Sequence, residues 1–209
     1  MRKGSDTEMT STVEDKQVSL VLAQAAQIGA SKSPAGVGEV LAVVLLPKVG
    51  VEGESNVTVR GVTEDVLQFR PSVKIVEGRA ANAGADEVVI GQSIKGRFKG
   101  MNIGDSFELK KNRPMKVVGV FDDNGSAYES EVWADVHAVR QAFGRSGSVS
   151  SVRVRLDSPS KFDAFKALVE GDRQLGLIAM READYVEKQA QGTGIMLKEP
   201  KERTRELSA

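Results

Sequence analysis

The chain has 209 residues, of which 40% are hydrophobic and only 5% aromatic, and its 29 basic residues balance 29 acidic ones. A chain of this length buries enough surface to fold without a disulfide or a structural metal, and the absence of cysteine excludes thiol nucleophiles and Cys-ligated zinc. Nucleic-acid-binding proteins usually carry a basic excess, which is missing here, so we expect no nucleic-acid partner.

The sequence contains no segment that predicts a membrane crossing. Its longest apolar run, VLAVVLL at residues 40–46, is far shorter than the roughly 20 residues that a membrane helix needs. The N-terminal residues MRKGSDTEMTST also lack the apolar core of a signal peptide. We therefore expect the chain on its own to be soluble.

The first predicted elements are a helix and a strand. Residues 12–29 place apolar side chains at helical spacing on one face, which predicts an amphipathic helix. Ser11 and Glu14 have the spacing of a capping box at its start. A buried strand is expected at residues 39–46, ended by Pro47.

The stretch RGVTEDVLQFRPSVKIVEGR, residues 60–79, predicts a strand, a short helix, a second strand and a turn. Its three arginines, Arg60, Arg70 and Arg79, allow two interpretations: an anion-binding site, or positions that stabilise the fold. The neutral net charge and the lack of a phosphate-binding motif favour the second. At the exit of this stretch we expect Glu77 and Arg79 to pair with the backbone or with each other.

Between residues 85 and 146 short strands alternate with glycine-containing turns, which is typical of a small, partly barrel-like β structure. Short helices are expected at SIKGRF and VHAVRQAF. Strands are predicted for EVVIG, SFELK, MKVVGVF and SEVWADV, at residues 87–91, 106–110, 115–121 and 130–136.

The pattern of alternating strands and helices returns after the flexible GRSGS segment. We predict a strand at residues 150–156, a helix opened by Ser158-Pro159, a strand at residues 175–181 and a final helix EADYVEKQAQG. The order βαβ, then a β insert, then βαβ places the chain in the α+β class, with two related halves around an insertion.

Two motifs fail the tests for nucleotide and calcium binding. Gly91 and Gly96 have P-loop spacing, but Arg97 and Phe98 replace the lysine and hydroxyl residue that contact phosphate and Mg²⁺. In VFDDNGSAYESE, alignment with a calcium loop places Val120 where the first ligand oxygen is required. We interpret both segments as turns.

Catalytic and metal-binding residues are not expected. His137, the single histidine, has no second ligand at metal-binding spacing, and no serine lies in a G-x-S-x-G motif. The chain is therefore predicted not to be an enzyme and to need no cofactor or metal. The candidate partner-binding residues are Tyr128, Glu129 and Trp133, since exposed aromatic residues often anchor interfaces. Half-buried packing of the two aromatic residues is an equally open interpretation.

Several segments, taken in order, resemble the periplasmic core domain of MacB-type ABC-transporter permeases, which include MacB, FtsX and LolC-like proteins. They are RKGSDTEMTS (2–11), EVLAVVLLPK (39–48), VTVRGVTEDVLQFRPSVKIVEGR (57–79), EVVIGQSIKGRFKGMNIGDSFEL (87–109), KVVGVFDDNGSAYESEVWADV (116–136), DAFKALVEGD (163–172) and READYVEKQAQG (181–192).

The resemblance implies two lobes. An α/β porter-like lobe is built from both chain ends, and a small β-rich, Sabre-like lobe is inserted between them. The expected divisions are an extended segment 1–11, the first half of the porter-like lobe 12–84, the inserted lobe 85–146, the second half 147–193, and a charged, flexible tail 194–209.

The resemblance also implies a function. The chain would be a non-catalytic domain at the periplasmic face of the bacterial inner membrane, belonging to an ABC export-type permease. ATP hydrolysis would reside on a separate ATPase subunit or domain, and motion of the membrane helices would drive capture or expulsion of an amphiphilic, peptide or lipoprotein substrate.

The implied partners are the ABC ATPase subunit, a second permease copy and a periplasmic adaptor or carrier, whereas the isolated domain is expected to be monomeric. A free soluble periplasmic binding or chaperone module that reuses the same fold is the alternative interpretation.

Overall fold

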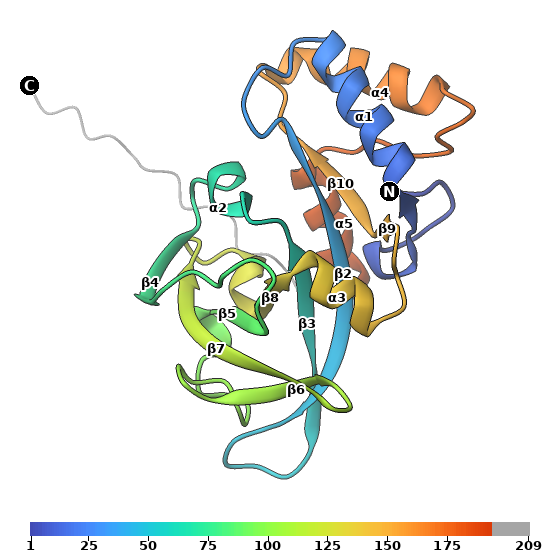
Figure 1. Ribbon diagram of the computed structural model, residues 1–209. Coiled ribbons are helices and arrows are strands. Elements are labelled where there is room, and N and C mark those ends of the chain that lie inside the picture. The colour runs from blue at the N-terminus through green and yellow to red at the C-terminus, as the bar shows by residue number, and fades with distance from the viewer. Residues whose placement is uncertain (194–209) are drawn as a thin grey trace, which may run out of the picture. The chain divides into compact units, whose positions relative to one another are not determined.

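Figure 1 shows a computed structural model of the chain, which describes residues 1–193. These residues belong to two compact units. The first, Met1–Ala179, contains every strand of the described residues, and the second begins at Met180. Within the second unit lies helix α5 (Glu182–Thr193), which confirms the helix predicted for EADYVEKQAQG.

A mixed eight-stranded sheet forms the centre of the first unit, in the order β10-β2-β3-β8-β5-β7-β4, with β6 also paired with β7. The pairs β3–β8 and β5–β7 are parallel and the other pairs are antiparallel. A separate two-stranded sheet joins β1 and β9. The strands are β1 Val13–Glu14, β2 Gly36–Pro47, β3 Glu54–Val62, β4 Lys74–Gly78, β5 Glu87–Gly91, β6 Ser106–Lys110, β7 Arg113–Asp122, β8 Glu131–Asp135, β9 Ser148–Val149 and β10 Ser151–Val154.

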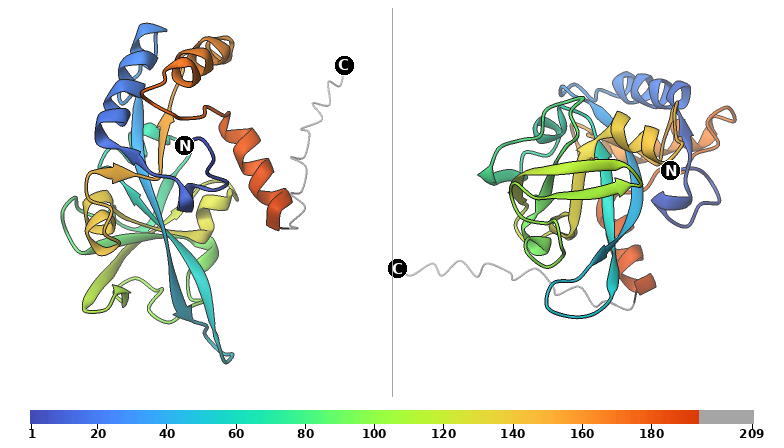
Figure 2. Two further views of the ribbon diagram at one scale, coloured as in Figure 1. Left: turned by 90° about the vertical axis from the view of Figure 1, so that its right-hand side faces the viewer. Right: turned by 60° about the horizontal axis from the view of Figure 1, so that its bottom comes forward.

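The helices of the first unit are grouped by position. Helices α1 (Asp15–Gln27) and α4 (Phe162–Gly171) lie side by side at one end of the sheet, whereas α3 (Val136–Ala142) lies against β3 (Figures 1 and 2). The remaining helical elements are short: η1 Glu8–Thr10, α2 Val66–Phe69, η2 Gln92–Ile94, η3 Ala127–Ser130 and η4 Pro159–Lys161.

Alternating side chains of β2 explain why this segment forms a strand at the centre of the core. Val40, Ala42, Val44 and Leu46 are buried, whereas Leu45 between the last two is 62% exposed. The main cluster of buried apolar side chains continues from α1 through this strand to β7, and a smaller cluster surrounds Trp133 and Phe121. The α+β class is therefore confirmed.

Both the sheet and the main core cluster are continuous across the expected lobe boundaries near residues 85 and 146. The division into a porter-like and an inserted lobe stays a prediction.

Three local expectations were wrong. Residues 175–181 form no strand, because their one ladder contact is an isolated bridge between Leu177 and Arg2. The SIKGRF helix is reduced to the 3-10 turn η2. At the start of α1, Gln17 rather than Ser11 completes the cap, since its Oε1 accepts from the Glu14 N–H at 2.9 Å. The Ser11 hydroxyl oxygen instead accepts from the Arg2 N–H at 2.9 Å.

Gly91, the last residue of β5, permits a close approach between two segments. A Cβ atom at this position would lie 2.0 Å from the Glu129 carbonyl oxygen of η3, which no real side chain tolerates. Gly91→Ala is expected to destabilise the fold by roughly 1–3 kcal/mol, because the backbone must shift to relieve this overlap.

The measurement is urea-induced unfolding, with Gly171→Ala as the matched control. Gly171 ends α4, and a Cβ atom added at this residue would meet no other atom within 4 Å. Its substitution is expected to be neutral or slightly stabilising. Equal midpoints for the two variants would contradict the close contact at Gly91.

Candidate functional site

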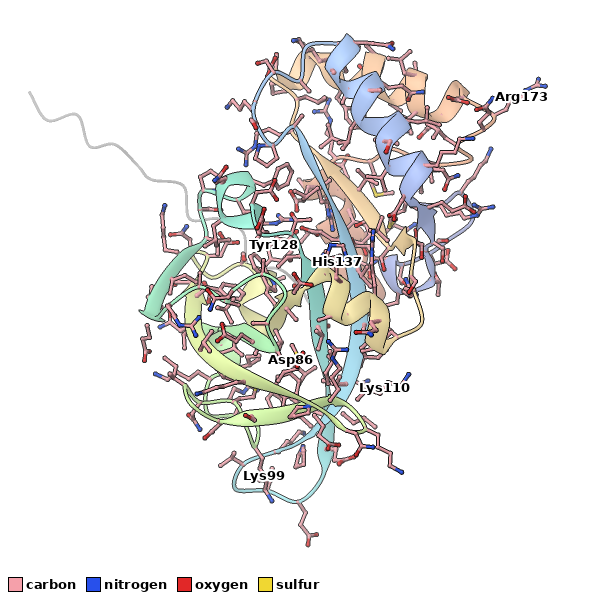
Figure 3. All side chains as sticks on the ribbon, viewed as in Figure 1. Asp86, Lys99, Lys110, Tyr128, His137 and Arg173 are labelled. Atoms are coloured by element: carbon pink, nitrogen blue, oxygen red, sulfur yellow. The ribbon has the colours of Figure 1, made fainter. Side chains whose placement is uncertain are left out.

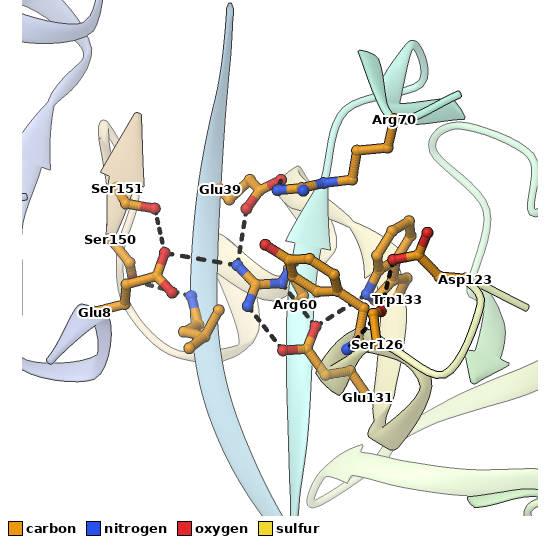
Figure 4. Close-up of polar contacts among 12 residues, drawn as sticks. Glu8, Glu39, Arg60, Arg70, Asp123, Ser126, Glu131, Trp133, Ser150 and Ser151 are labelled. Atoms are coloured by element: carbon orange, nitrogen blue, oxygen red, sulfur yellow. Dashed lines mark hydrogen bonds and ion pairs between the residues drawn. The ribbon is translucent and has the colours of Figure 1, made fainter. Parts of the chain in front are cut away.

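The most unusual group in the first unit is a set of six charged side chains gathered on one face of the sheet, five of which are labelled in Figure 4. The strand register explains the grouping. Arg60 of β3 lies opposite Trp133 of β8, and Glu39 of β2 lies opposite Ser151 of β10. Because residues two positions apart in a strand share a face, Glu131 lies on the same face as Arg60, and Arg153 on the same face as Glu39. Five of the six belong to buried residues, and the side chain of Arg153 is 13% exposed. The ionic cluster consists of Glu8, Glu39, Arg60, Arg70, Glu131 and Arg153.

Arg60 lies at the centre of this ionic cluster. Its Nε and Nη2 donate to the two carboxylate oxygens of Glu131 at 2.7 and 2.8 Å, a bidentate geometry that is among the strongest hydrogen-bonded ion pairs. Its Nη1 donates to Glu39 Oε2 at 2.8 Å and lies 3.6 Å from Glu8 Oε1. A single guanidinium thus connects η1, β2 and β8 to β3.

The other two arginines extend the cluster to both sides. Arg70, just after α2, donates from Nη2 to Glu39 Oε1 at 3.0 Å. Arg153 of β10 places its Nη2 2.8 Å from Glu8 Oε1, and the Ser151 hydroxyl donates to the same carboxylate. Glu8 is thereby held in the fold although it lies close to the N-terminus.

Aromatic rings cover the cluster on the side of β8. The Trp133 indole Nε1 donates to Glu131 Oε2 at 3.0 Å, and its ring stacks at a tilt on Phe121 with centroids 4.4 Å apart. The guanidinium carbons of Arg70 and Arg60 lie 4.4 and 5.0 Å from the ring centroid of Tyr128, which is cation–π geometry.

The protonation states follow from burial and from the facing charges. Burial raises the pKa of Glu39, but the guanidinium groups of Arg60, Arg70 and Arg153 outweigh it and lower that pKa from 4.5 to about 2. Burial raises the pKa of Glu8 as well, but the guanidinium groups of Arg60 and Arg153 outweigh burial and lower this pKa below its ordinary value. The pKa of Arg60 is raised well above its ordinary value because its carboxylate partners outweigh burial. Glu8, Glu39 and Arg60 are therefore ionised at neutral pH.

This arrangement supports a structural role better than a chemical one. Three arginines and three glutamates balance in charge, and an incoming anion would have to displace a carboxylate from its arginine. Ionised carboxylates held by guanidinium groups are weak bases. The fold-stabilising interpretation of Arg60 and Arg70 is thus favoured over an anion-binding site.

Arg79, the third arginine of the stretch, lies apart from the ionic cluster. It forms a two-pronged, largely exposed pair with Glu87 at 2.5 and 2.7 Å. Glu77 instead pairs with Lys95 at 2.6 Å. Of the two expected pairings, the one between Glu77 and Arg79 is absent, because the glycine turn at Gly78 sends the two side chains to different partners. The pairing of Arg79 with the backbone is confirmed, since its Nη1 donates to the Ala80 carbonyl oxygen at 3.0 Å.

The three candidate partner-binding residues occupy different environments. Trp133 is 1% exposed and Glu129 is 6% exposed, while Tyr128 is half-buried. The Glu129 carboxylate closes the turn before it by accepting from the N–H groups of Asp123 and Gly125 at 2.8 and 2.7 Å. Figure 3 shows Tyr128 surrounded by other side chains. Partner binding by Tyr128, Glu129 and Trp133 stays a prediction.

His137 and the carboxylates do not assemble a metal site in the part of the chain that the structure describes. No group of three or more His, Cys, Asp or Glu side chains within residues 1–193 has an arrangement that could hold a metal ion. His137 is exposed in the first turn of α3, where its backbone N–H donates to the Asp135 carboxylate at 2.8 Å.

The two ends of the first unit run antiparallel beside each other. Arg2 and Leu177 form a β-bridge, the Lys3 N–H donates to the Gly176 carbonyl at 2.9 Å, and the Ile178 N–H donates to the Met1 carbonyl at 2.9 Å. The chain therefore enters and leaves this unit at the same place.

Comparison with protein families explains this architecture. Residues 3–171 match the family described as MacB-like periplasmic core domain. The chain belongs to this family. A MacB-like periplasmic core domain is the extracytoplasmic part of an ABC-transporter permease. Within residues 1–193, no helix has the length and apolar character needed to cross a membrane.

The fold is shared with a solved structure. The extracellular domain of the noncanonic ABC-type transporter YknZ from Gram-positive bacteria aligns over 94% of both chains, with a TM-score of 0.57 and 14% sequence identity. A domain of a Porphyromonas gingivalis protein named as a permease aligns over 77% of this chain and 83% of its own, with a TM-score of 0.41 and 14% identity. The search of curated proteins found no match.

Arg60→Ala is expected to destabilise this MacB-like domain by about 3–5 kcal/mol, because it leaves Glu39 and Glu131 buried without their main partner. The matched control is Arg79→Ala, which also removes an arginine paired with a carboxylate but at a site where the arginine is 52% exposed. That control is expected to lose less than about 1 kcal/mol. Comparable losses in urea titrations of the two variants would refute a stabilising role specific to the buried cluster.

The pH dependence of stability is expected to report on Glu39. Its pKa of about 2 in the folded state lies below its ordinary value of 4.5, so the folded state holds fewer protons. The stabilisation, on the order of 3 kcal/mol, is complete above pH 4.5 and is lost as the pH falls towards 2. Unfolding free energies measured between pH 6 and pH 2 should fall less steeply for Glu39→Gln than for the wild type. Parallel curves would contradict the lowered pKa.

Proposed function

We propose that this chain is the moving extracytoplasmic domain of an ABC export-type permease, which couples ATP-driven motion of membrane helices to the capture or expulsion of a substrate. An amphiphile, a peptide or a lipoprotein is the substrate class that the family resemblance implies. ATP hydrolysis would occur on a separate subunit or domain.

The observation that carries the proposal is the antiparallel contact between residues 1–3 and 176–178. A domain inserted between two consecutive membrane helices must receive and return the chain at one side. The neighbouring ends of the first unit satisfy this requirement.

The ionic cluster supports the coupling part of the proposal. Motion applied to the N-terminal segment reaches Glu8 within a few residues, and Glu8 is paired with Arg153 and lies within 3.6 Å of Arg60. Since Arg60 is bound in turn to β2 and β8, a displacement at the chain end is carried into the sheet rather than absorbed by a loose loop. The partners in this mechanism would be the ATPase subunit, a second permease copy and a periplasmic adaptor or carrier.

Cysteine labelling tests the proposed location, since the chain has no cysteine of its own. Val51, in the loop between β2 and β3, is 62% exposed, and Val59 within β3 is fully buried. Val51→Cys, placed in the intact reading frame and expressed in bacteria, is expected to react with a membrane-impermeant maleimide on spheroplasts with an intact cytoplasmic membrane.

Val59→Cys is the matched control and should react only after denaturation. Labelling of Val51→Cys only in lysed cells would place the domain in the cytoplasm and overturn the proposal. Release of the labelled protein with the soluble periplasmic fraction would instead favour a free binding or chaperone module.

A further inference from the structure

A small pocket lies beside the carboxyl ends of the neighbouring parallel strands β3 and β8. Its volume is about 60 Å³. Side chains from β3, α2, β4, β5 and β8 and from the loop after β4 line it. The apolar part of the lining includes Val62, Leu67, Ile75, Ala81, Val89 and Trp133.

The size and the lining restrict what this pocket can hold. It is smaller than an apolar cavity of about 150 Å³ that accommodates benzene, so it admits an aliphatic group of a few carbons and no aromatic ring. Its apolar residues belong to the smaller core cluster, around Trp133 and Phe121, and therefore form a rigid floor. A branched aliphatic side chain such as valine is the natural fit.

The polar residues of the pocket carry negative charge. Glu64 and Asp135 contribute carboxylates, Thr63 and Asn82 contribute neutral polar groups, and none of the residues lining the pocket is lysine or arginine. Glu64 is exposed, so its carboxylate can contact a group at the mouth, whereas the half-buried Asp135 carboxylate already accepts the N–H groups of Gly84 and His137 and contributes through its charge. The local field favours a cation there.

The outer wall of the pocket is a loop that hydrogen bonds and an ion pair hold in place. Residues 79–87 read RAANAGADE and are fastened at both ends by the Arg79–Glu87 pair, while the Asn82 N–H donates to Glu87 Oε2 at 3.1 Å. The Gly84 N–H donates to Asp135 Oδ2 at 3.2 Å, which attaches the loop to the end of β8. The small side chains of Ala80, Ala81 and Ala83 leave the pocket unfilled.

We propose that this pocket binds one aliphatic side chain of a partner protein, and that a lysine or arginine flanks this side chain in the partner's sequence. The aliphatic group enters the apolar floor, and the flanking cation lies at the mouth near Glu64 and Asp135. The two contributions select the occupant by charge complementarity as well as by size. This inference does not depend on the proposed transport role.

Trp133, the single tryptophan of the chain, forms part of the pocket wall and supplies the readout. The probe is acetyl-Lys-Val-Lys-amide, added to the whole chain while tryptophan emission is recorded. We expect a saturable change in emission. Acetyl-Lys-Gly-Lys-amide, which lacks the aliphatic group, and acetyl-Glu-Val-Glu-amide, which reverses the charge, are each expected to bind at least about tenfold more weakly.

Substitutions in the chain test the same site. Ala81→Leu fills the pocket and should weaken binding of the lysine–valine peptide at least about tenfold, whereas Ala85→Leu, in the same loop but outside the lining, should not. Glu64→Gln, at an exposed position, should weaken binding and reduce its dependence on salt.

Several results would overturn the proposal. They are equal binding of the three peptides, the absence of any saturable emission change, or unchanged binding by Ala81→Leu. Self-association in sedimentation that Ala81→Leu abolishes would show that the occupant is a second copy of the chain, which also refutes it. Labelling of Val51→Cys in spheroplasts is independent of all these results, so failure of the pocket and failure of the proposed location are distinguishable.

Discussion

The pairing of Arg60 is the constraint on which the rest of the structure depends. A guanidinium that is 3% exposed cannot be left without carboxylates, because an uncompensated buried charge costs several kcal/mol. The pairs that satisfy it come from β2, from β8 and from the segment before β1, so they fix which strands neighbour β3 and in which register. An apolar residue at this position would bury equally well and would specify none of these neighbours. In the order β2-β3-β8 a parallel pair adjoins an antiparallel pair. The ion pairs of Arg60 help to specify this order, in addition to the packing of the apolar core.

Local patterns predicted much of the fold, and long-range pairing explains what they missed. The helix at residues 12–29 and the strand at 39–46 were recognisable because their apolar periodicity is decided by residues a few positions apart. The alternation of Val57 and Val59 with Thr58 and Arg60 reports one buried face of β3, but it does not reveal that the opposite face is covered as well, so that Arg60 is only 3% exposed. Its partner Glu131 lies 71 residues away in the sequence, and no local pattern reports such a pair. Charged residues inside otherwise apolar strands, such as Arg153 in SSVRVRL, are the one signal that was present and unused.

Trp133 connects the two regions of interest in the first unit. Its side chain lines the pocket beside β3 and β8, and its indole N–H donates to the Glu131 carboxylate that is paired with Arg60. Sequence reasoning left two interpretations of this residue open, an anchor for a partner and half-buried packing. The structure places its side chain in the interior, where it contributes to both regions. The same reasoning could not detect the pocket, which is assembled from five separate segments and from the small size of three alanines.

The neighbouring ends of the first unit determine how it responds to a pull. A force that separates residue 1 from residue 178 acts across the short antiparallel ladder between Arg2 and Leu177, so its hydrogen bonds break one after another, as in the opening of a zipper. A force that moves both ends together leaves this ladder unloaded. Beyond the ladder, the next strong attachment of the N-terminal segment is Glu8, whose ion pair with Arg153 lies inside the fold. Separation of the two ends is therefore opposed first by these few backbone hydrogen bonds and then by the buried ion pair of Glu8, so the N-terminal residues detach before the sheet is loaded.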